Sequence, residues 1–199
     1  MKSEDCDDIG IQSARRFAEI HDSEFSHALQ VARNSLQLFD PLVKLHGLGR
    51  RARILLHASA LMHDTGYENA AGEHHKGSRD QILAAQLKGF TNKEHRVMAC
   101  IARYHRGALP KPSHKIYSKL SERRQAIVGI LAAFLRIADG LDRSHVSSVQ
   151  SIRVEYQQGN TIHVYVKQVE LNRTDIAGGM RKNDLFEKIF DARLLIEHE

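Results

Sequence analysis

The sequence has no tryptophan and only two cysteines, Cys6 and Cys100, among its 199 residues. The two cysteines form neither a CxxC pair nor a framework of several bridges, so we expect free thiols rather than a disulfide-stabilised secreted domain. Proline is also scarce, with three residues. With a hydrophobic share of 42% and a charged share of 27%, the composition is typical of a folded globular protein and excludes a disordered or fibrous chain.

Long apolar runs are missing as well. No segment approaches the roughly 18 consecutive apolar residues that a membrane-spanning helix needs. The first ten residues are acidic and lack the apolar stretch of a signal peptide. We therefore expect a cytoplasmic protein without a membrane-embedded segment, in which residues 1–8 form a disordered tail.

The formal net charge of +5 is unevenly distributed. Between Arg103 and Arg124 seven basic residues stand against a single acid, Glu122. A solvated basic face is the plain interpretation of such a run, and an anionic partner is the functional one. Nucleic acid is not favoured, because the basic residues are not interleaved with stacking aromatics and no helix-turn-helix or finger signature is present.

Apolar residues recur at helical spacing through most of the first 147 residues. The pattern predicts helices over about residues 5–20, 23–45, 50–63, 78–88, 91–106 and 121–141. Ser23, and either Thr91 or Asn92, are suitable N-caps, and residues 65–77 are predicted to form a polar loop. The last of these helices is apolar over more than one face, which predicts a central buried helix.

The hydrophobic period changes after Ser147. Residues 149–156 and 162–166 alternate like two strands around a Gly159-Asn160 turn, which predicts a β-hairpin. A helix over residues 175–190 and a short strand over residues 192–196 are expected to follow. The predicted fold class is thus mostly α: a helical domain over residues 1–147, followed by a small α+β unit over residues 148–199.

Thirteen histidines are a high count, and several stand at predicted helix ends. Side chains from separate helices can converge there, and metal sites in helical bundles are built in this way from imidazoles and carboxylates. An aspartate on the buried helix would be costly without a partner, and a cation would satisfy it. For any single histidine a hydrogen-bonded core role is the alternative. The candidate ligands are His27, His63, Asp64, His105, Asp139 and one of His74 and His75.

The order of these residues resembles the HD superfamily of metal-dependent phosphohydrolases over about residues 20–146. Four segments are similar to the C-terminal HD domain of the exopolyphosphatase/guanosine-pentaphosphatase family, namely residues 61–66, 74–78, 103–106 and 135–143. The hairpin and the segment 181–188 are similar to the small unit that ends those proteins. The resemblance implies an HD-type helical fold. The actin-like N-terminal domains that hydrolyse phosphoanhydrides in that family have no counterpart in this sequence, so polyphosphatase activity is not implied.

The resemblance also implies a ligand scheme. One divalent metal would be held by His27, His63, Asp64 and Asp139, and Asp64 would bridge to a second metal held by His74 and His105. His74 is preferred to His75 because the small Ser78 follows it by one helical turn. The mixed nitrogen and oxygen ligand set suits one or two ions of Mn, Fe, Co, Ni, Zn or Mg rather than calcium.

Within this scheme Asp64 and His105 are also the catalytic candidates. Lys76, Arg106 and Arg143 lie within a few positions of the ligands and are candidates to bind phosphate, with surface charge as the alternative. The leading functional hypothesis is metal-dependent hydrolysis of a phosphoester, perhaps of a nucleotide, by activated water.

Two further hypotheses stay open. One is a non-catalytic module that binds polyphosphate or a nucleotide through residues 103–124. The other is a di-iron oxygenase, because some HD members build such a site from the same ligand pattern. For the hydrolase and for the binding module, the expected partner is a phosphate-containing small molecule or polyphosphate. For the oxygenase, the expected substrate is a polyol or a phosphonate. The apolar central helix or a free sheet edge could also support a homodimer.

Overall fold

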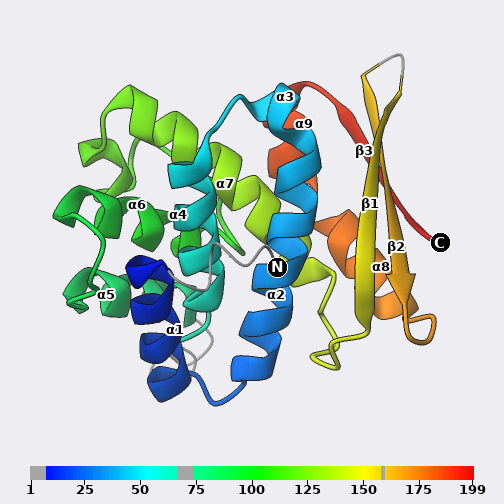
Figure 1. Ribbon diagram of the computed structural model, residues 1–199. Coiled ribbons are helices and arrows are strands. Elements are labelled where there is room, and N and C mark those ends of the chain that lie inside the picture. Colours follow the sequence, from blue (N-terminus) through cyan, green and yellow to red (C-terminus); the bar gives the residue numbers. More distant parts are fainter. Residues whose placement is uncertain (1–7, 67–73, 158–159) are drawn as a thin grey trace.

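The computed structural model describes residues 8–66, 74–157 and 160–199, and its core is a bundle of helices (Figure 1). Residues 1–7 of the predicted tail, most of the predicted loop 65–77, Gly159 and Cys6 lie outside these residues. The helices are α1 (Ile9–His21), α2 (Phe25–Phe39), α3 (Val43–His46), α4 (Arg50–Leu61), α5 (His74–Ala84), α6 (Asn92–Arg103), α7 (Glu122–Gly140), α8 (Arg173–Arg181) and α9 (Asp184–Phe190).

Two helix starts show why the chain turns helical where it does. The Asp8 side chain accepts hydrogen bonds from the backbone nitrogens of Gly10 and Ile11 at the start of α1. Thr91 and Glu94 form a reciprocal capping box at the start of α6. These caps satisfy backbone donors that have no partner within the helix. The choice between Thr91 and Asn92 is thereby settled in favour of Thr91.

The predicted helix over residues 23–45 is divided in the structure. Helix α2 begins at Phe25, and its N-cap is Glu24 rather than the predicted Ser23. A short 3-10 turn, Asp40–Leu42, then separates α2 from α3. Pro41 lies in this turn, where it lacks the amide proton that a continuous α-helix requires.

Helix α7 is the central element that the sequence predicts. It contacts α2, α4, α6, α8 and α9. Most of its apolar side chains, including those of Leu131, Phe134 and Leu135, are fully buried. Burial on several sides explains why the apolar residues of α7 do not form a single stripe.

The C-terminal residues form a three-stranded mixed sheet at one side of the helices (Figure 1). Its strands are β1 (Val149–Gln157), β2 (Thr161–Gln168) and β3 (Arg193–His198). Strands β1 and β2 are antiparallel and β3 pairs in parallel with β2, so β2 is central. The predicted hairpin, final strand and mostly helical fold class are confirmed.

The prediction of a single helix over residues 175–190 is wrong. Helix α8 ends at Arg181, Lys182 is its C-cap, and α9 begins at Asp184. The Asn183 side chain turns to β3, where it donates a hydrogen bond to the Leu194 carbonyl oxygen at 3.3 Å. The break lies beside the last turns of α7, where Lys182 pairs with Asp139 and Asp184 pairs with Arg136.

Two glycines bring α8 against α7. A Cβ atom added at Gly140 would lie 2.5 Å from the carbonyl oxygen of Gly178, and one added at Gly178 would lie 2.2 Å from that of Gly140. Only glycine permits this backbone approach. Apolar residues of the helical part and of the sheet thus form one continuous core. None of the helices in the described ranges is both long and apolar enough to cross a membrane.

Candidate metal centre

The six residues predicted as metal ligands converge on one buried point. His27 lies in the first turn of α2, and His74 is the first residue of α5. His63 and Asp64 follow the end of α4, His105 follows the end of α6, and Asp139 lies in the last turn of α7. Each of the six is less than 9% exposed. Helix ends from five different helices therefore meet. The sequence predicts four of them and places His74 in a loop, whereas His74 begins α5 in the structure.

Asp64 lies between two groups of histidines. Its Oδ1 atom is 3.4 Å from Nε2 of His74 and 3.4 Å from Nε2 of His105. Its Oδ2 atom is 3.5 Å from Nε2 of His63 and 4.0 Å from Nε2 of His27. Ligand atoms that share one ion at about 2.1 Å are themselves about 3.0–3.5 Å apart. The carboxylate thus faces two positions of the right size for a cation.

Hydrogen bonds made by Nδ1 orient three of the rings, those of His63, His105 and His27, so that Nε2 of each ring faces the cluster. Nδ1 of His63 lies 2.8 Å from the carbonyl oxygen of Ala60, and Nδ1 of His105 lies 2.7 Å from that of Ala102. These bonds form because each histidine closes the last turn of its helix. Nδ1 donates to the carbonyl, which leaves Nε2 as the free lone pair that a metal needs.

His27 is oriented by Asp142, whose Oδ2 atom lies 2.8 Å from Nδ1 of the ring. Asp142 is fully buried, and its Oδ1 atom accepts a hydrogen bond from the backbone nitrogen of Ser147 at 2.8 Å. A carboxylate behind a histidine fixes its tautomer and raises its basicity toward a cation.

His74, rather than His75, is the histidine that the structure places against Asp64. The hydroxyl of Ser78 donates to the backbone oxygen of His74 at 3.0 Å and accepts from the backbone nitrogen of Gly66 at 3.0 Å. A Cβ atom at Gly66 would lie 2.1 Å from the backbone nitrogen of Ser78. A small residue at each position therefore lets α5 approach the end of α4.

The donor atoms fit a metal ion. Two triads, His27–His63–Asp64 and Asp64–His74–His105, each bring their ligand atoms within 4.8 Å of one another. Nε2 of His27, Nε2 of His63 and Oδ1 of Asp64 are buried and have no hydrogen-bond partner in the described part of the chain. Buried polar atoms are rarely left in this state. A nitrogen and oxygen set of this kind suits a divalent transition metal.

Asp139 stands beside the first triad but shares its charge with a lysine. Its Oδ1 atom is 3.4 Å from Nε2 of His27, while its Oδ2 atom forms an ion pair with Nζ of Lys182. Burial would raise the pKa of Asp139, but Lys182 and the contact with His27 outweigh it and hold the pKa well below its usual range. Asp139 is therefore a carboxylate.

The surroundings of the cluster shift the pKa values of His27 and His105 in opposite directions. Burial by itself would lower the pKa of His27, but its contacts with Asp139 and Asp142 raise it to about 10. Burial lowers the pKa of His105 well below its usual value, and the charges of His63 and Lys182 act in the same direction. His105 is thus neutral, and its Nε2 atom can offer a lone pair to a metal ion. His27 would have to release a proton before it could hold a cation.

The three predicted phosphate-binding residues lie in different surroundings. Arg106 is half-buried, and its Nη1 atom donates to Nε2 of His74 at 2.9 Å. Lys76 lines a neighbouring cavity, and Arg143 is exposed on the turn after α7. Arg106 therefore contacts the cluster directly, through His74.

Three residues that contact the centre were not predicted from the sequence: Asp142, Lys182 and His145. The His145 ring stacks on the His27 ring, with the two centroids 3.8 Å apart. Asp142 lies one helical turn beyond Asp139, and this spacing was a usable signal. Lys182 and His145 carried none, since their positions depend on the fold of the C-terminal unit.

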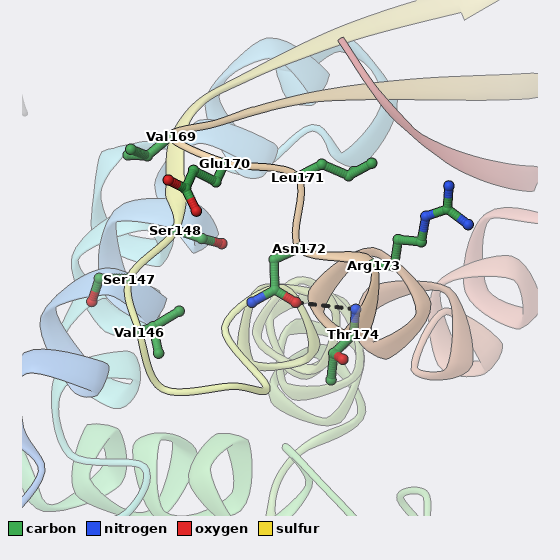
Figure 2. Close-up of a pocket in the computed structure, with 9 residues that line it drawn as sticks. All are labelled: Val146, Ser147, Ser148, Val169, Glu170, Leu171, Asn172, Arg173 and Thr174. Atoms are coloured by element: carbon green, nitrogen blue, oxygen red, sulfur yellow. Dashed lines mark hydrogen bonds between the residues drawn. The ribbon is translucent and has the colours of Figure 1, made fainter.

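Among the cavities in the described part of the chain, two that lie outside the cluster are lined by polar side chains. One of about 390 Å³ is lined by Lys76, Arg79, Arg103 and Lys115, together with Tyr104 and Tyr117. The other, of about 510 Å³, lies between residues 146–148 and 169–174 (Figure 2). There the Asn172 side chain turns to the start of α8 and accepts a hydrogen bond from the Thr174 nitrogen at 3.1 Å. It caps a helix, so we assign no site to this second cavity.

Comparison with known proteins places this centre in a family. No curated protein matches the sequence. A family model described as Ppx/GppA phosphatase, domain III, matches residues 9–178, which include all six clustered residues and the helices that carry them. The chain therefore belongs to the Ppx/GppA phosphatase domain III family.

Proposed function

We propose that this protein is a metal-dependent phosphohydrolase that cleaves a phosphoester. The observation that carries the proposal is the pair of triads that share Asp64, in which Nε2 of His27, Nε2 of His63 and Oδ1 of Asp64 are buried and have no hydrogen-bond partner in the described part of the chain. Two divalent cations in such an arrangement supply an activated water and neutralise phosphoryl charge. The arrangement of His27, His63, Asp64, Asp139, His74 and His105 supports the ligand scheme that the sequence analysis predicts.

The side chains around the centre support a role with phosphate. Asp64 holds the two triads together, so that a phosphoryl group between them would meet both at once. Arg106 lies at the His74 side and can offer two parallel N–H donors to phosphate oxygens. His105, which burial keeps neutral, provides a lone pair rather than a charge. We include Asp64 and His105 as the catalytic residues of the proposal.

The test is hydrolysis by the full chain loaded separately with Mn²⁺, Fe²⁺, Co²⁺, Ni²⁺, Zn²⁺ and Mg²⁺. The probes are p-nitrophenyl phosphate and bis(p-nitrophenyl) phosphate, and bound metal is measured in parallel by elemental analysis. We expect metal-dependent turnover that the His63→Ala, Asp64→Ala double variant lowers by about 1000-fold or more. The same activity in the double variant would overturn the proposal. Lys93→Ala, an exposed change on α6, is the matched control.

A non-catalytic binding module is the second candidate, and the cavity of about 390 Å³ favours it. Its lining carries four basic side chains and two tyrosine rings, which suits an anion with an aromatic portion such as a nucleotide. Micromolar binding of a nucleoside triphosphate without turnover in any metal-loaded form would support this candidate. Hydrolysis that is lost in the His63→Ala, Asp64→Ala double variant would exclude this candidate.

A further inference from the structure

Lys182 brings a positive charge to the metal centre from the C-terminal unit. Its Nζ atom forms an ion pair with Oδ2 of Asp139, and its side chain is 19% exposed. Asp139 turns its other oxygen, Oδ1, toward His27 and His63 at 3.4 Å and 3.9 Å. The same carboxylate therefore faces the first metal position on one side and an ammonium group on the other.

The fold holds Lys182 in this position. Helix α8 is pressed against the end of α7 at the contact between Gly140 and Gly178. Its first turn is held by Asp175, a fully buried residue whose carboxylate accepts hydrogen bonds from the hydroxyls of Ser144 and Ser148 at 3.0 Å and 2.8 Å. Lys182 is the C-cap residue of this helix, one turn beyond Gly178, and its side chain lies beside Asp139.

Arg106 brings a second positive charge to the cluster, at the other triad, where it donates a hydrogen bond to Nε2 of His74. Each half of the cluster thus has a cationic side chain in contact with it: Lys182 at the Asp139 end and Arg106 at the His74 end. Both side chains are partly buried. Cations placed in this way raise the free energy of a metal ion nearby, and they lower the free energy of an anion that approaches the metal.

We propose that Lys182 is a phosphate-binding residue of this centre, whose ammonium group opposes metal binding at the first triad and attracts a phosphate oxygen. The inference rests on the metal site of the proposed function, but it does not require hydrolysis. It assigns the C-terminal unit a part in the site: the unit delivers the charge that matches Arg106 on the far side of the cluster.

Lys182→Met tests the proposal, because it keeps the length of the side chain and removes its charge. Metal binding to the full chain is measured by calorimetric titration with Mn²⁺ and with Zn²⁺. Binding of inorganic phosphate to the metal-loaded protein is then measured in the same way. We expect Lys182→Met to bind metal about fivefold or more tightly at the first position and phosphate about tenfold more weakly.

The opposite signs separate this role from a structural one. A lysine that merely keeps Asp139 in place would, when removed, weaken metal and phosphate together, and that result would overturn the proposal. Unchanged affinity for both would overturn it too. Lys182→Arg keeps the charge and should restore phosphate binding to within about threefold. Lys188→Met, an exposed change on α9, should alter neither affinity.

The same titrations separate this inference from the proposed function. If neither the wild-type protein nor Lys182→Met binds metal, the metal site itself is wrong and both proposals fail. If the wild-type protein binds metal and the variant differs in neither affinity, only the role of Lys182 fails. Hydrolysis is not needed to read either result.

Discussion

Nδ1 of His27 lies 2.8 Å from Oδ2 of Asp142, a residue 115 positions further along the chain. Both side chains are almost completely buried, and Oδ1 of Asp142 is engaged by the backbone nitrogen of Ser147. The pair ties the start of α2 to the turn after α7. It also points Nε2 of His27 at Asp64 and Asp139. The orientation of the first triad thus depends on a residue that is not itself a member of it.

Asp142→Asn should therefore weaken metal binding without removing a ligand. The amide lacks the charge that supports the His27 ring, and loss of such a partner typically costs about 10- to 100-fold in metal affinity. Calorimetric titration with Mn²⁺ or Zn²⁺ measures the change. Asp80→Asn, an exposed change on α5, is the control. Equal affinity in Asp142→Asn and wild type would show that Asp142 does not orient His27.

His74→Ala and His75→Ala should differ in metal content. His74 lies 3.4 Å from Asp64 in the second triad, whereas His75 is a neighbour outside it. Elemental analysis of metal-loaded protein should therefore find one ion fewer per chain in His74→Ala and the wild-type number in His75→Ala. Loss of an ion in His75→Ala alone would reverse the assignment of the ligand.

Gly140→Ala should destabilise the protein by about 2 kcal/mol or more. Its new methyl group would lie 2.5 Å from the carbonyl oxygen of Gly178, so α7 and α8 would have to separate. Urea unfolding at neutral pH measures the loss. Gly129→Ala is the matched control on the same helix, where the nearest atom is the flexible Ile189 Cδ1 at 3.3 Å. Its effect should stay within about 1 kcal/mol, since alanine favours a helix.

Glu94→Gln should lower stability at neutral pH but not in strong acid. Two hydrogen bonds from Arg51, of 2.6 Å and 2.8 Å, together with those from Thr91 lower the pKa of Glu94 to about 2. Because this value lies below the unfolded value of about 4.5, the carboxylate stabilises the fold fully above pH 4.5 and progressively less as the pH falls to 2.

We expect Glu94→Gln to cost about 0.5–1 kcal/mol at pH 7 after solvent screening, and less as the pH is lowered toward 2. Urea unfolding at several pH values tests this. Glu19→Gln removes an exposed pair with Arg15 and should cost less at every pH. A cost for Glu94→Gln that did not decrease with pH would rule out the ion pair as its source.

Much of the centre could be predicted from local sequence signals. His63, Asp64 and His105 stand where apolar helical spacing ends, and Asp139 lies on a helix that is apolar over more than one face. Helix ends and periodicity are properties of neighbouring residues, so they can be read without knowledge of the fold. The mostly helical fold class and the C-terminal hairpin followed from the same kind of signal.

Other features depended on contacts between distant segments. The position of His74 against Asp64 relies on the Gly66–Ser78 contact, and that of Lys182 relies on the Gly140–Gly178 contact. The break between α8 and α9 also escaped the helical pattern, because its stabilising hydrogen bond runs from Asn183 to β3. Such features follow from how closely two backbones can approach.

The sequence by itself thus determined most of the helices of the first 147 residues and placed His63, Asp64 and His105 at helix ends, because hydrophobic period, caps and glycines act over a few residues. Only the tertiary structure decided that Asp142 supports His27 and that Lys182 and Arg106 flank the two triads. Those relationships join residues far apart in the chain. They arise when packing of the shared core brings helix ends from both parts of the chain to one point.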